Sequence, residues 1–265
     1  MDLNDICNKV EIIAAETAEF IMSESERFDK NLIKTKGLHD FVSYVDIGAE
    51  KILVEKLGRL LPEAGFKVEE GTSSKKGLEF CWIIDPLDGT TNFLHKLHPF
   101  SISIGLSKHD EVIAGVVFEA GGREIFTAWK NGGAWLNGKK IKVSQTADLA
   151  NSLIATGFPY KDFDRLKDYL ESFQHFLKNS QGIRRMGSAS IDLAYVACGR
   201  FDAFYEYGLN PWDVAAGTIL VREAGGLISD FSGNEKNLTG IEIVAANNLV
   251  YNEFLEIVSK FMAKR

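Results

Sequence analysis

The sequence predicts a layered fold of mixed helices and strands, built as one domain with two unlike halves. The chain has 265 residues, of which 45% are hydrophobic and 25% charged, and this suits one large globular domain. Between residues 100 and 135 short β-rich runs are separated by turn residues, which is typical of antiparallel hairpins. After about residue 145 strand-like and helix-like segments alternate, which indicates α/β layering. We therefore divide the domain into halves of about 1–145 and 146–265.

The first half opens with two predicted helices. Apolar residues recur at helical spacing from residue 3 to about 26, and again from near Asp46 to Leu60. A short strand over 65–70 and a buried strand over 80–84 follow. The hairpin region then predicts strands at 101–106, 112–118 and 124–129, with turns at 109–110, 121–122 and 131–133.

The second half begins after the polar boundary at residues 145–148. Its alternating pattern predicts four strands and four helices, with no internal repeat. The strands are expected at 152–156, 183–186, 201–206 and 226–230, and the helices at about 162–178, 189–198, 212–224 and 250–263.

Charge, hydropathy and cysteines narrow the function classes. The net charge of −7 gives no basic field for nucleic acid, so no direct nucleic-acid binding is expected. No apolar run approaches the roughly 20 residues that span a bilayer, and the first residues do not resemble a secretory signal. Three cysteines, Cys7, Cys81 and Cys198, lie far apart without a CxxC pair, which indicates reduced thiols. We expect a cytoplasmic protein with no membrane contact.

The chain is organised around residues 82–93, WIIDPLDGTTNF. The buried strand ends in two carboxylates, Asp85 and Asp88, and Pro86 is expected to turn the chain away from the strand ladder. Gly89 allows a positive φ, and the residues after it begin a short helix with free N–H groups. Carboxylates attract hard cations and helix N-termini attract phosphate, so this stretch predicts metal-assisted phosphoryl chemistry. A structural turn, built from the same residue types, is the alternative.

Residues 85–93, DPLDGTTNF, together with residues 212–217, WDVAAG, resemble the two signatures of the inositol monophosphatase family. The resemblance covers nearly the whole chain. It implies an αβαβα five-layer fold and a Mg²⁺-dependent, Li⁺-sensitive phosphatase that is commonly a homodimer.

The resemblance also implies a metal site and a water-activating pair. The segment from residue 36 to Asp46 resembles the family element D-x-V-T-x-x-D, with Ser43 where threonine is usual. Asp46 is thereby expected to accept a hydrogen bond from Thr90 and to help position the attacking water. Glu69 is assigned as a ligand, although Glu70 remains an alternative register. The implied metal ligands are Glu69, Asp85, the Leu87 carbonyl, Asp88 and Asp213.

The substrate is expected to lie between the phosphate-binding turn and the second half. Free N–H groups of Gly89, Thr90 and Thr91 would hold the phosphate. By resemblance, the alcohol would meet Gly187, Ser188 and Ala189, and Glu206 would bind a ring hydroxyl. Asp88 and Asp213 complete the implied substrate-binding set, and Asp46, Glu69 and Thr90 the catalytic set. The purely structural alternatives are an N-cap for Ser188 and a helix-dipole role for Asp46 and Asp213.

The predicted function is hydrolysis of a small alcohol phosphomonoester, inositol monophosphate above all, by a metal-activated water. Four gathered carboxylates would repel one another strongly, and two or three Mg²⁺ ions would relieve that repulsion. The alternatives are the same chemistry on fructose 1,6-bisphosphate, a nucleotide 3′-phosphate or NADP, or a partner role in RNA transcription. His95 and His98 have no partner at ligand spacing and are expected only to line the cleft or the surface.

Overall fold

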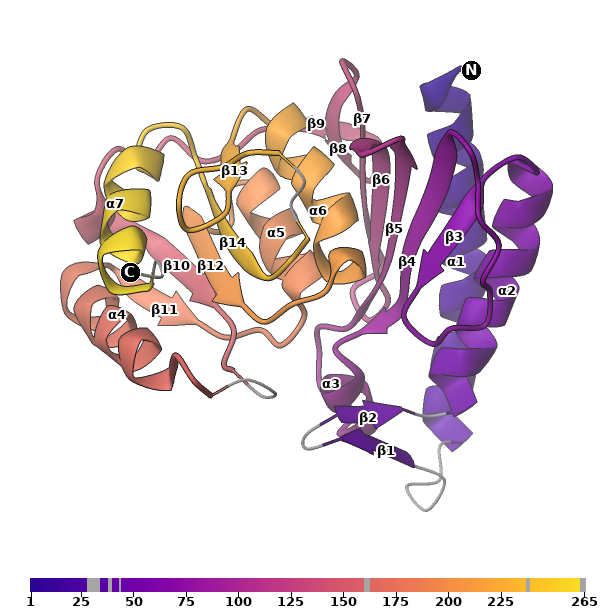
Figure 1. Ribbon diagram of the computed structural model, residues 1–265, viewed down its shortest axis with the longest axis horizontal. Helices are drawn as coiled ribbons and strands as arrows, with labels where there is room; N and C mark the ends of the chain where they lie inside the picture. Colours follow the sequence, from indigo (N-terminus) through magenta and orange to yellow (C-terminus); the bar gives the residue numbers. More distant parts are fainter. Residues whose placement is uncertain (28–33, 38–39, 43, 160–162, 237–238, 263–265) are drawn as a thin grey trace.

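The computed structural model describes residues 1–27, 34–37, 40–42, 44–159, 163–236 and 239–262, and the side chains of 34–42 are not part of the description. Its elements lie in five layers, in the order helices, sheet, helices, sheet, helices (Figure 1). The predicted αβαβα fold is confirmed. Within the described residues, no helix is both long and apolar enough to cross a membrane.

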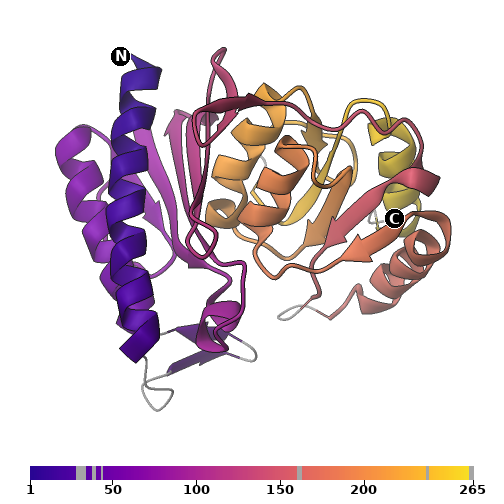
Figure 2. The same cartoon turned by 180° about the vertical axis from the view of Figure 1, so that it is seen from behind.

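The first outer layer consists of α1 (Leu3–Arg27) and α2 (Tyr44–Leu60), which lie side by side against one face of the larger sheet (Figure 2). Both predicted helices are confirmed. Their buried side chains, such as Val10, Ala14 and Leu53, recur at helical spacing and pack into the first hydrophobic core. Ser43, which the sequence comparison singled out just before α2, lies outside the described residues.

The larger sheet has seven strands in the order β3–β4–β5–β6–β7–β8–β9. Every neighbouring pair is antiparallel except β3 and β4, which are parallel. The last two strands and the separate hairpin β1–β2 were not among the predicted elements. The bounds are β1 Lys34–Gly37, β2 Asp40–Val42, β3 Gly65–Val68, β4 Phe80–Asp88, β5 Ser101–Lys108, β6 Glu111–Glu119, β7 Glu124–Trp129, β8 Gly133–Leu136 and β9 Lys139–Ile141.

Strand β4, which carries the two acids, is longer than predicted. It pairs with β5 as far as Asp88 opposite Ser101, so the prediction that Pro86 turns the chain out of the ladder is wrong. The register shifts between Asp85 and Asp88, and this bulge accommodates a residue that has no N–H to donate. The turn comes instead at Gly89, whose φ of 93° is in the left-handed region that glycine adopts without strain. The short helix α3 (Thr90–Leu94) follows at once, as predicted.

The smaller sheet has five strands in the order β11–β10–β12–β14–β13. The first three are mutually parallel, and β14 pairs antiparallel with both β12 and β13. Four of the strands were predicted within a few residues, but β14 was not. The bounds are β10 Leu153–Thr156, β11 Gly182–Arg184, β12 Ala203–Tyr207, β13 Leu227–Ser229 and β14 Glu242–Ala246. A short 3₁₀ helix, Leu149–Asn151, precedes β10.

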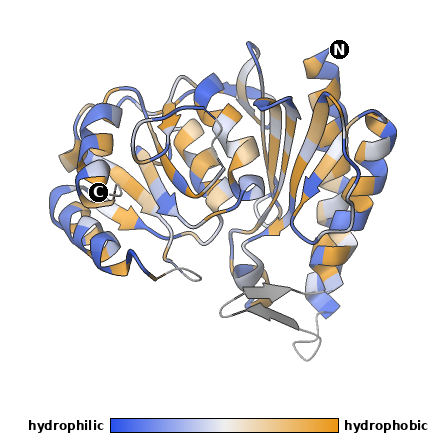
Figure 3. Cartoon of the chain, in the orientation of Figure 1, coloured by the Kyte–Doolittle hydropathy of each residue, from blue (hydrophilic) through white to orange (hydrophobic). Residues whose placement is uncertain are grey.

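The other outer layer consists of α4 (Leu166–Asn179) and α7 (Tyr251–Met262). Both are amphipathic, with Phe176 and Phe254 packed in the hydrophobic core that these helices form with the smaller sheet. Figure 3 shows hydrophilic and hydrophobic residues interspersed along both ribbons. They agree with the predicted helices except at the ends. The predicted start of the first helix at residue 162 and the predicted end of the last at 263 lie outside the described residues.

Helices α5 (Ala189–Ala197) and α6 (Pro211–Glu223) lie between the two sheets, so they are buried on nearly every face (Figure 1). Their closeness to the larger sheet depends on small residues. A Cβ at Gly115 of β6 would lie 2.6 Å from Ile219 Cγ2 and 2.8 Å from Ala216 Cα. The absent side chain therefore lets α6 pack directly on the strand, and α6 carries Asp213.

Candidate active site

The candidate site is a cavity of about 420 Å³ between the two sheets. Of the predicted site residues, all except Asp46 line it, and Asp46 lies behind Thr90. Glu69 lines the cavity and Glu70 does not, which agrees with the choice of Glu69. Predicted residues lining the cavity are Glu69, Asp85, Leu87, Asp88, Gly89, Thr90, Thr91, Gly187, Ser188, Ala189, Glu206 and Asp213; others are Gly157, Phe158, Pro159, Phe163, Arg185, Asp192, Leu209 and Asn210.

Asp85 lies at the centre of the acidic cluster. Its side chain is 2% exposed, and one carboxylate oxygen accepts the Leu87 N–H at 2.9 Å, which folds the bulge around it. Burial raises the pKa of Asp85 well above its usual range, and the nearby carboxylates of Glu69, Asp88 and Asp213 raise it further. Carboxylates from β4, from α6 and from the residue just after β3 are thus brought together, as predicted.

Asp88 is held by the N-terminal end of α5. Its Oδ2 accepts hydrogen bonds from the Ser188 hydroxyl at 2.7 Å, the Ser190 hydroxyl at 2.6 Å and the Ser190 N–H at 2.8 Å. Burial raises the pKa of Asp88, and these donors oppose the shift. Ser188 is the N-cap residue of α5, but its side chain makes no capping bond. The sequence reasoning missed Ser190, for which the GSAS run was the available signal.

Thr90 links the strand end to α2. Its hydroxyl lies 3.1 Å from Asp46 Oδ1 and 3.0 Å from the Leu87 carbonyl, so it can donate to one of them at a time. Asp46 is 2% exposed and lies in the first turn of α2. The predicted contact between Asp46 and Thr90 is therefore present, across 44 positions of sequence.

Asp213 has both a structural and a site-facing role. Its Oδ2 accepts the Asn210 N–H at 2.7 Å, and the two residues form a capping box at the start of α6, where Pro211 occupies the first turn. Burial, with the repulsion of Asp88, raises the pKa of Asp213 to about 7, although the hydrogen bond from Asn210 opposes this. The cap fixes the orientation of the Asp213 carboxylate, and Asp213 lines the cavity.

Glu206 is the penultimate residue of β12 and fits against a glycine. A Cβ built on Gly157 would lie 1.9 Å from the Glu206 carboxylate, so only glycine leaves room for that side chain. Burial raises the pKa of Glu206 to about 8; Arg185 opposes the shift, while Asp213 and Asp88 add to it. Sequence reasoning missed Gly157 and Arg185, because nothing in their local sequence separates them from loop residues.

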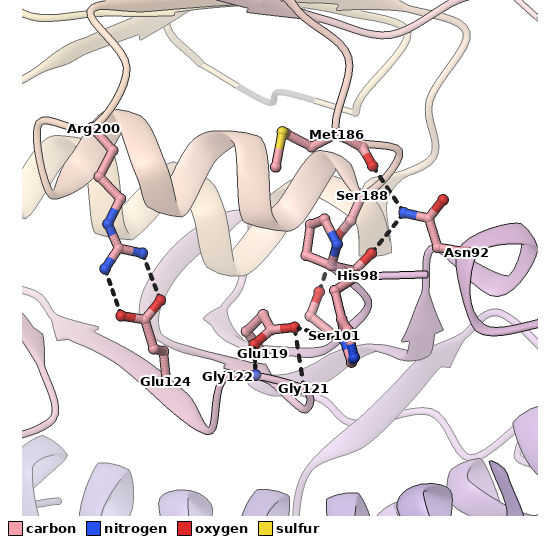
Figure 4. Close-up of polar contacts among 11 residues, drawn as sticks. Asn92, His98, Ser101, Glu119, Gly121, Gly122, Glu124, Met186, Ser188 and Arg200 are labelled. Carbon is pink, nitrogen blue, oxygen red and sulfur yellow. Dashed lines mark hydrogen bonds and ion pairs between the residues drawn. The ribbon is translucent and has the colours of Figure 1, made fainter. Parts of the chain in front are cut away.

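The phosphate-binding turn is tied to the second half by Asn92. Its side-chain amide donates to the Met186 carbonyl at 2.8 Å and to the Pro99 carbonyl at 2.7 Å (Figure 4). Beneath it, the Ser101 hydroxyl lies within hydrogen-bonding distance of the hydroxyls of both Ser188 and Ser190. These contacts hold the Gly89–Thr91 turn next to the loop at Gly187.

The donor chemistry of the cavity fits hard cations. It is lined by carboxylates whose burial, together with their mutual repulsion, raises their pKa values, and carboxylate oxygens are the ligands that Mg²⁺ prefers. Among the described residues, no three histidine, cysteine, aspartate or glutamate side chains are already arranged as a metal cage. The fit thus rests on the donor set, and Glu69, Asp85, Asp88, Asp213 and the Leu87 carbonyl are the groups that would hold the ions.

None of the histidines and cysteines that the structure describes lines the cavity. His98 is half exposed, stacks on Phe100 and lies 3.6 Å from Glu119 (Figure 4). Cys7 is buried, and burial raises the pKa of its thiol to about 12. Cys81 and Cys198 are only partly buried.

Comparisons with known proteins agree with the geometry of the site. Residues 3–262 match the sequence profile of the inositol monophosphatase family. The chain is 43% identical over 230 residues to an inositol-1-monophosphatase of Rhizobium meliloti, with 86% of each chain covered. It is 42% identical over 250 residues to a Nus factor SuhB of Pseudomonas aeruginosa, with 92% of each covered.

Solved structures give the same result. An IMPase of Thermotoga maritima superposes with a TM-score of 0.88 at 35% identity, covering 97% of this chain and 98% of that one. The extragenic suppressor protein suhB of Bartonella henselae superposes with a TM-score of 0.91 at 35% identity, covering 97% and 99%. The chain therefore belongs to the inositol monophosphatase family, a family of metal-dependent phosphatases.

Proposed function

We propose that the protein hydrolyses a small alcohol phosphomonoester with Mg²⁺, and that inositol monophosphate is the substrate. One observation carries the proposal: the Thr90 hydroxyl, in contact with Asp46, lies in the same cavity as the carboxylates of Glu69, Asp85, Asp88 and Asp213. A hydroxyl held by a buried carboxylate beside a cation-binding cluster suits the positioning of a nucleophilic water. Two or three Mg²⁺ ions, bound there, would supply a water of lowered pKa and stabilise the leaving alkoxide.

The chain's own groups would orient the reactants. Asp46 accepts from Thr90, and this leaves the Thr90 oxygen able to accept a hydrogen bond from the attacking water. Free N–H groups at the start of α3, from Gly89 to Thr91, would hold the phosphate oxygens and stabilise charge in the transition state. No covalent phosphoenzyme is required, because the water itself is the nucleophile.

The alcohol would lie towards the second half of the chain. Gly187, Ser188 and Ala189 line that side of the cavity, and Glu206 stands at the end of β12. A carboxyl group can pair with a ring hydroxyl, since the hydroxyl both donates and accepts. This arrangement favours a cyclitol phosphate over a featureless ester.

The test is a panel of phosphate esters assayed with the purified protein, with Mg²⁺ and after chelation. We expect turnover that depends strictly on Mg²⁺, inhibition by Li⁺, and the highest kcat/KM on inositol monophosphate. Asp213→Asn should reduce kcat by about 10²-fold or more, the scale of losing one important electrostatic group, with an unchanged circular dichroism spectrum. Full turnover after exhaustive chelation would contradict the proposal. A higher kcat/KM on fructose 1,6-bisphosphate, a nucleotide 3′-phosphate or NADP would keep the chemistry and change the substrate.

A second candidate function is a partner role in RNA transcription. It is favoured by the relative from Pseudomonas aeruginosa, which is named Nus factor SuhB and is 42% identical. The partner role is tested by capturing the tagged protein from cells and identifying the proteins bound to it. Recovery of RNA polymerase or Nus factors would support the role, and their absence under conditions that retain known complexes would argue against it. We also propose a cytoplasmic location and a homodimer. The cell fraction that contains the tagged protein tests the first, and the mass of the purified protein in solution tests the second.

A further inference from the structure

Helix α2 points two buried carboxylates towards the candidate site. Asp46 and Glu50 are four residues apart, so they lie on the same face of the helix, one turn from each other. Asp46 is 2% exposed and Glu50 is 0% exposed. Asp46 contacts Thr90, but Glu50 has no part in the proposed reaction, and its burial needs an explanation.

Glu50 binds the loop that follows β3. Its Oε2 accepts the Glu70 N–H at 2.6 Å, and its Oε1 accepts the Thr72 N–H at 2.7 Å. Both oxygens of one carboxylate are thus engaged by backbone groups of one loop. Hydrogen bonds to an ionised acceptor are roughly twice as strong as neutral ones, so this contact can hold a loop firmly.

The loop needs such a contact because it has left the sheet. β3 ends at Val68, and the last ladder-like bond is the long one from the Glu69 N–H to the Ile84 carbonyl, 3.3 Å. The chain then passes through Gly71 in the left-handed region, with φ of 70°. Glu69 therefore sits between the end of a strand on one side and the two N–H groups held by Glu50 on the other.

We propose that Glu50 is a positioning residue that fixes the carboxylate of Glu69 in the cavity. One helix then sets two parts of the site at once, because α2 holds Thr90 through Asp46 and the loop bearing Glu69 through Glu50. The inference rests on the proposed function, in which Glu69 holds a metal ion. It adds a residue that touches neither substrate nor metal and acts only through the loop.

The test variant is Glu50→Gln, which keeps the shape but offers one acceptor oxygen, so its NH₂ group faces one of the two loop N–H groups. The matched control is Glu223→Gln. Glu223, also on a helix, accepts the N–H groups of Asn131 at 2.9 Å and Gly133 at 2.8 Å, in a turn remote from the cavity. Each variant weakens a carboxylate contact with two backbone N–H groups of a loop. Only the loop held by Glu50 carries a predicted metal ligand, Glu69.

Binding of Mn²⁺ alone, measured by calorimetry, gives a readout that does not depend on turnover. Substitution of groups that orient metal ligands typically costs 10–100-fold in affinity or activity, so Glu50→Gln should lose about that factor in Mn²⁺ affinity and in kcat. Glu223→Gln should match the wild type in both. In the wild type, Mn²⁺ should slow amide exchange at Glu70 and Thr72 and leave Asn131 and Gly133 unchanged.

The outcomes separate this inference from the proposed function. Wild-type Mn²⁺ affinity and kcat in Glu50→Gln, together with a strong loss in Glu69→Gln, would overturn the role of Glu50 alone. Wild-type behaviour in Glu69→Gln would instead remove Glu69 from the proposed metal site. If Glu50→Gln fails to fold, the amide-exchange result on the wild type decides: equal effects of Mn²⁺ on both loops would overturn the inference.

Discussion

At the scale of single residues, the proposed role of Glu206 is to recognise the alcohol and not to take part in catalysis. Phosphate and metal groups would treat every phosphomonoester alike, so discrimination falls to groups that reach the alcohol. A hydrogen bond contributes roughly 0.5–1.5 kcal/mol between neutral partners and roughly 1.5–3 kcal/mol when one partner is charged, so the discrimination should lie between about two- and a hundredfold. Glu206→Gln should therefore lose kcat/KM on inositol monophosphate and spare p-nitrophenyl phosphate.

Gly157 offers an independent check on the same side chain. Gly157→Ala would force the Glu206 carboxylate to move, since the new Cβ would lie within about 2 Å of it. It should reproduce the selectivity loss of Glu206→Gln without altering the carboxylate itself. Equal losses on both esters, in either variant, would place Glu206 in the catalytic machinery or the fold.

The sequence, together with its family resemblance, predicted most of the site lining but few of the residues that support it. Asp85, Asp88 and Asp213 stand within two recognisable motifs, so they could be named from sequence. Ser190 and Glu50 could not, because each supports a site residue through a contact that depends on the tertiary fold. Serine in the first turn of a helix and glutamate within a helix are also ordinary residues on any solvated surface.

At the scale of elements, the strands and helices with strong periodicity were predictable, and those defined by partners were not. Helices α1 and α7 have clear apolar stripes. By contrast, β9 and β14 are short segments whose strand conformation depends on pairing with a neighbouring strand. The ladder through Pro86 was mispredicted for a related reason. A bulge removes the need for the missing N–H, and only the register with β5 reveals it.

The packing of α6 on the larger sheet gives a prediction at this scale. Gly115→Ala would overpack the interface, which typically costs about 1–3 kcal/mol, and would push α6 and Asp213 away from β4. The control, Gly226→Ala, places a Cβ 2.8 Å from Val221 and 2.9 Å from the Ala246 carbonyl, near the other end of α6. Both should lower the melting temperature, but Gly115→Ala should also lower kcat. Equal kcat values in the two variants would mean that the position of Asp213 tolerates this shift.

At the scale of the whole molecule, the buried acids make stability depend on pH and metal together. The pKa values of Asp213 and Glu206 are raised to about 7 and about 8, and those of Asp85 and Asp88 are also raised. The folded state thus binds more protons than the unfolded chain, whose carboxyl pKa values are about 4. The free energy of unfolding of the metal-free protein should therefore fall as the pH rises from about 4 to about 8.

Melting temperatures measured over that range, with Mg²⁺ or with a chelator, check this prediction. Mg²⁺ binds the ionised carboxylates, so the difference between the two curves should widen as the pH rises. Asp213→Asn removes one of the titrating groups and should flatten the metal-free curve. A metal-free melting temperature that stays level or rises between about pH 5 and about pH 8 would show that the acids are not protonated in the folded state.

The order of the site residues along the chain has a consequence for synthesis. Asp213 is the last of the four carboxylates, and it reaches the other three only when α6 docks between the two sheets. A nascent chain that has emerged only as far as β9 already contains Glu69, Asp85 and Asp88, yet it has neither Asp213 nor the serines that hold Asp88. Under the proposed role of Asp213, phosphatase activity should appear only after α6 has emerged from the ribosome, and its onset would report that the two halves have assembled.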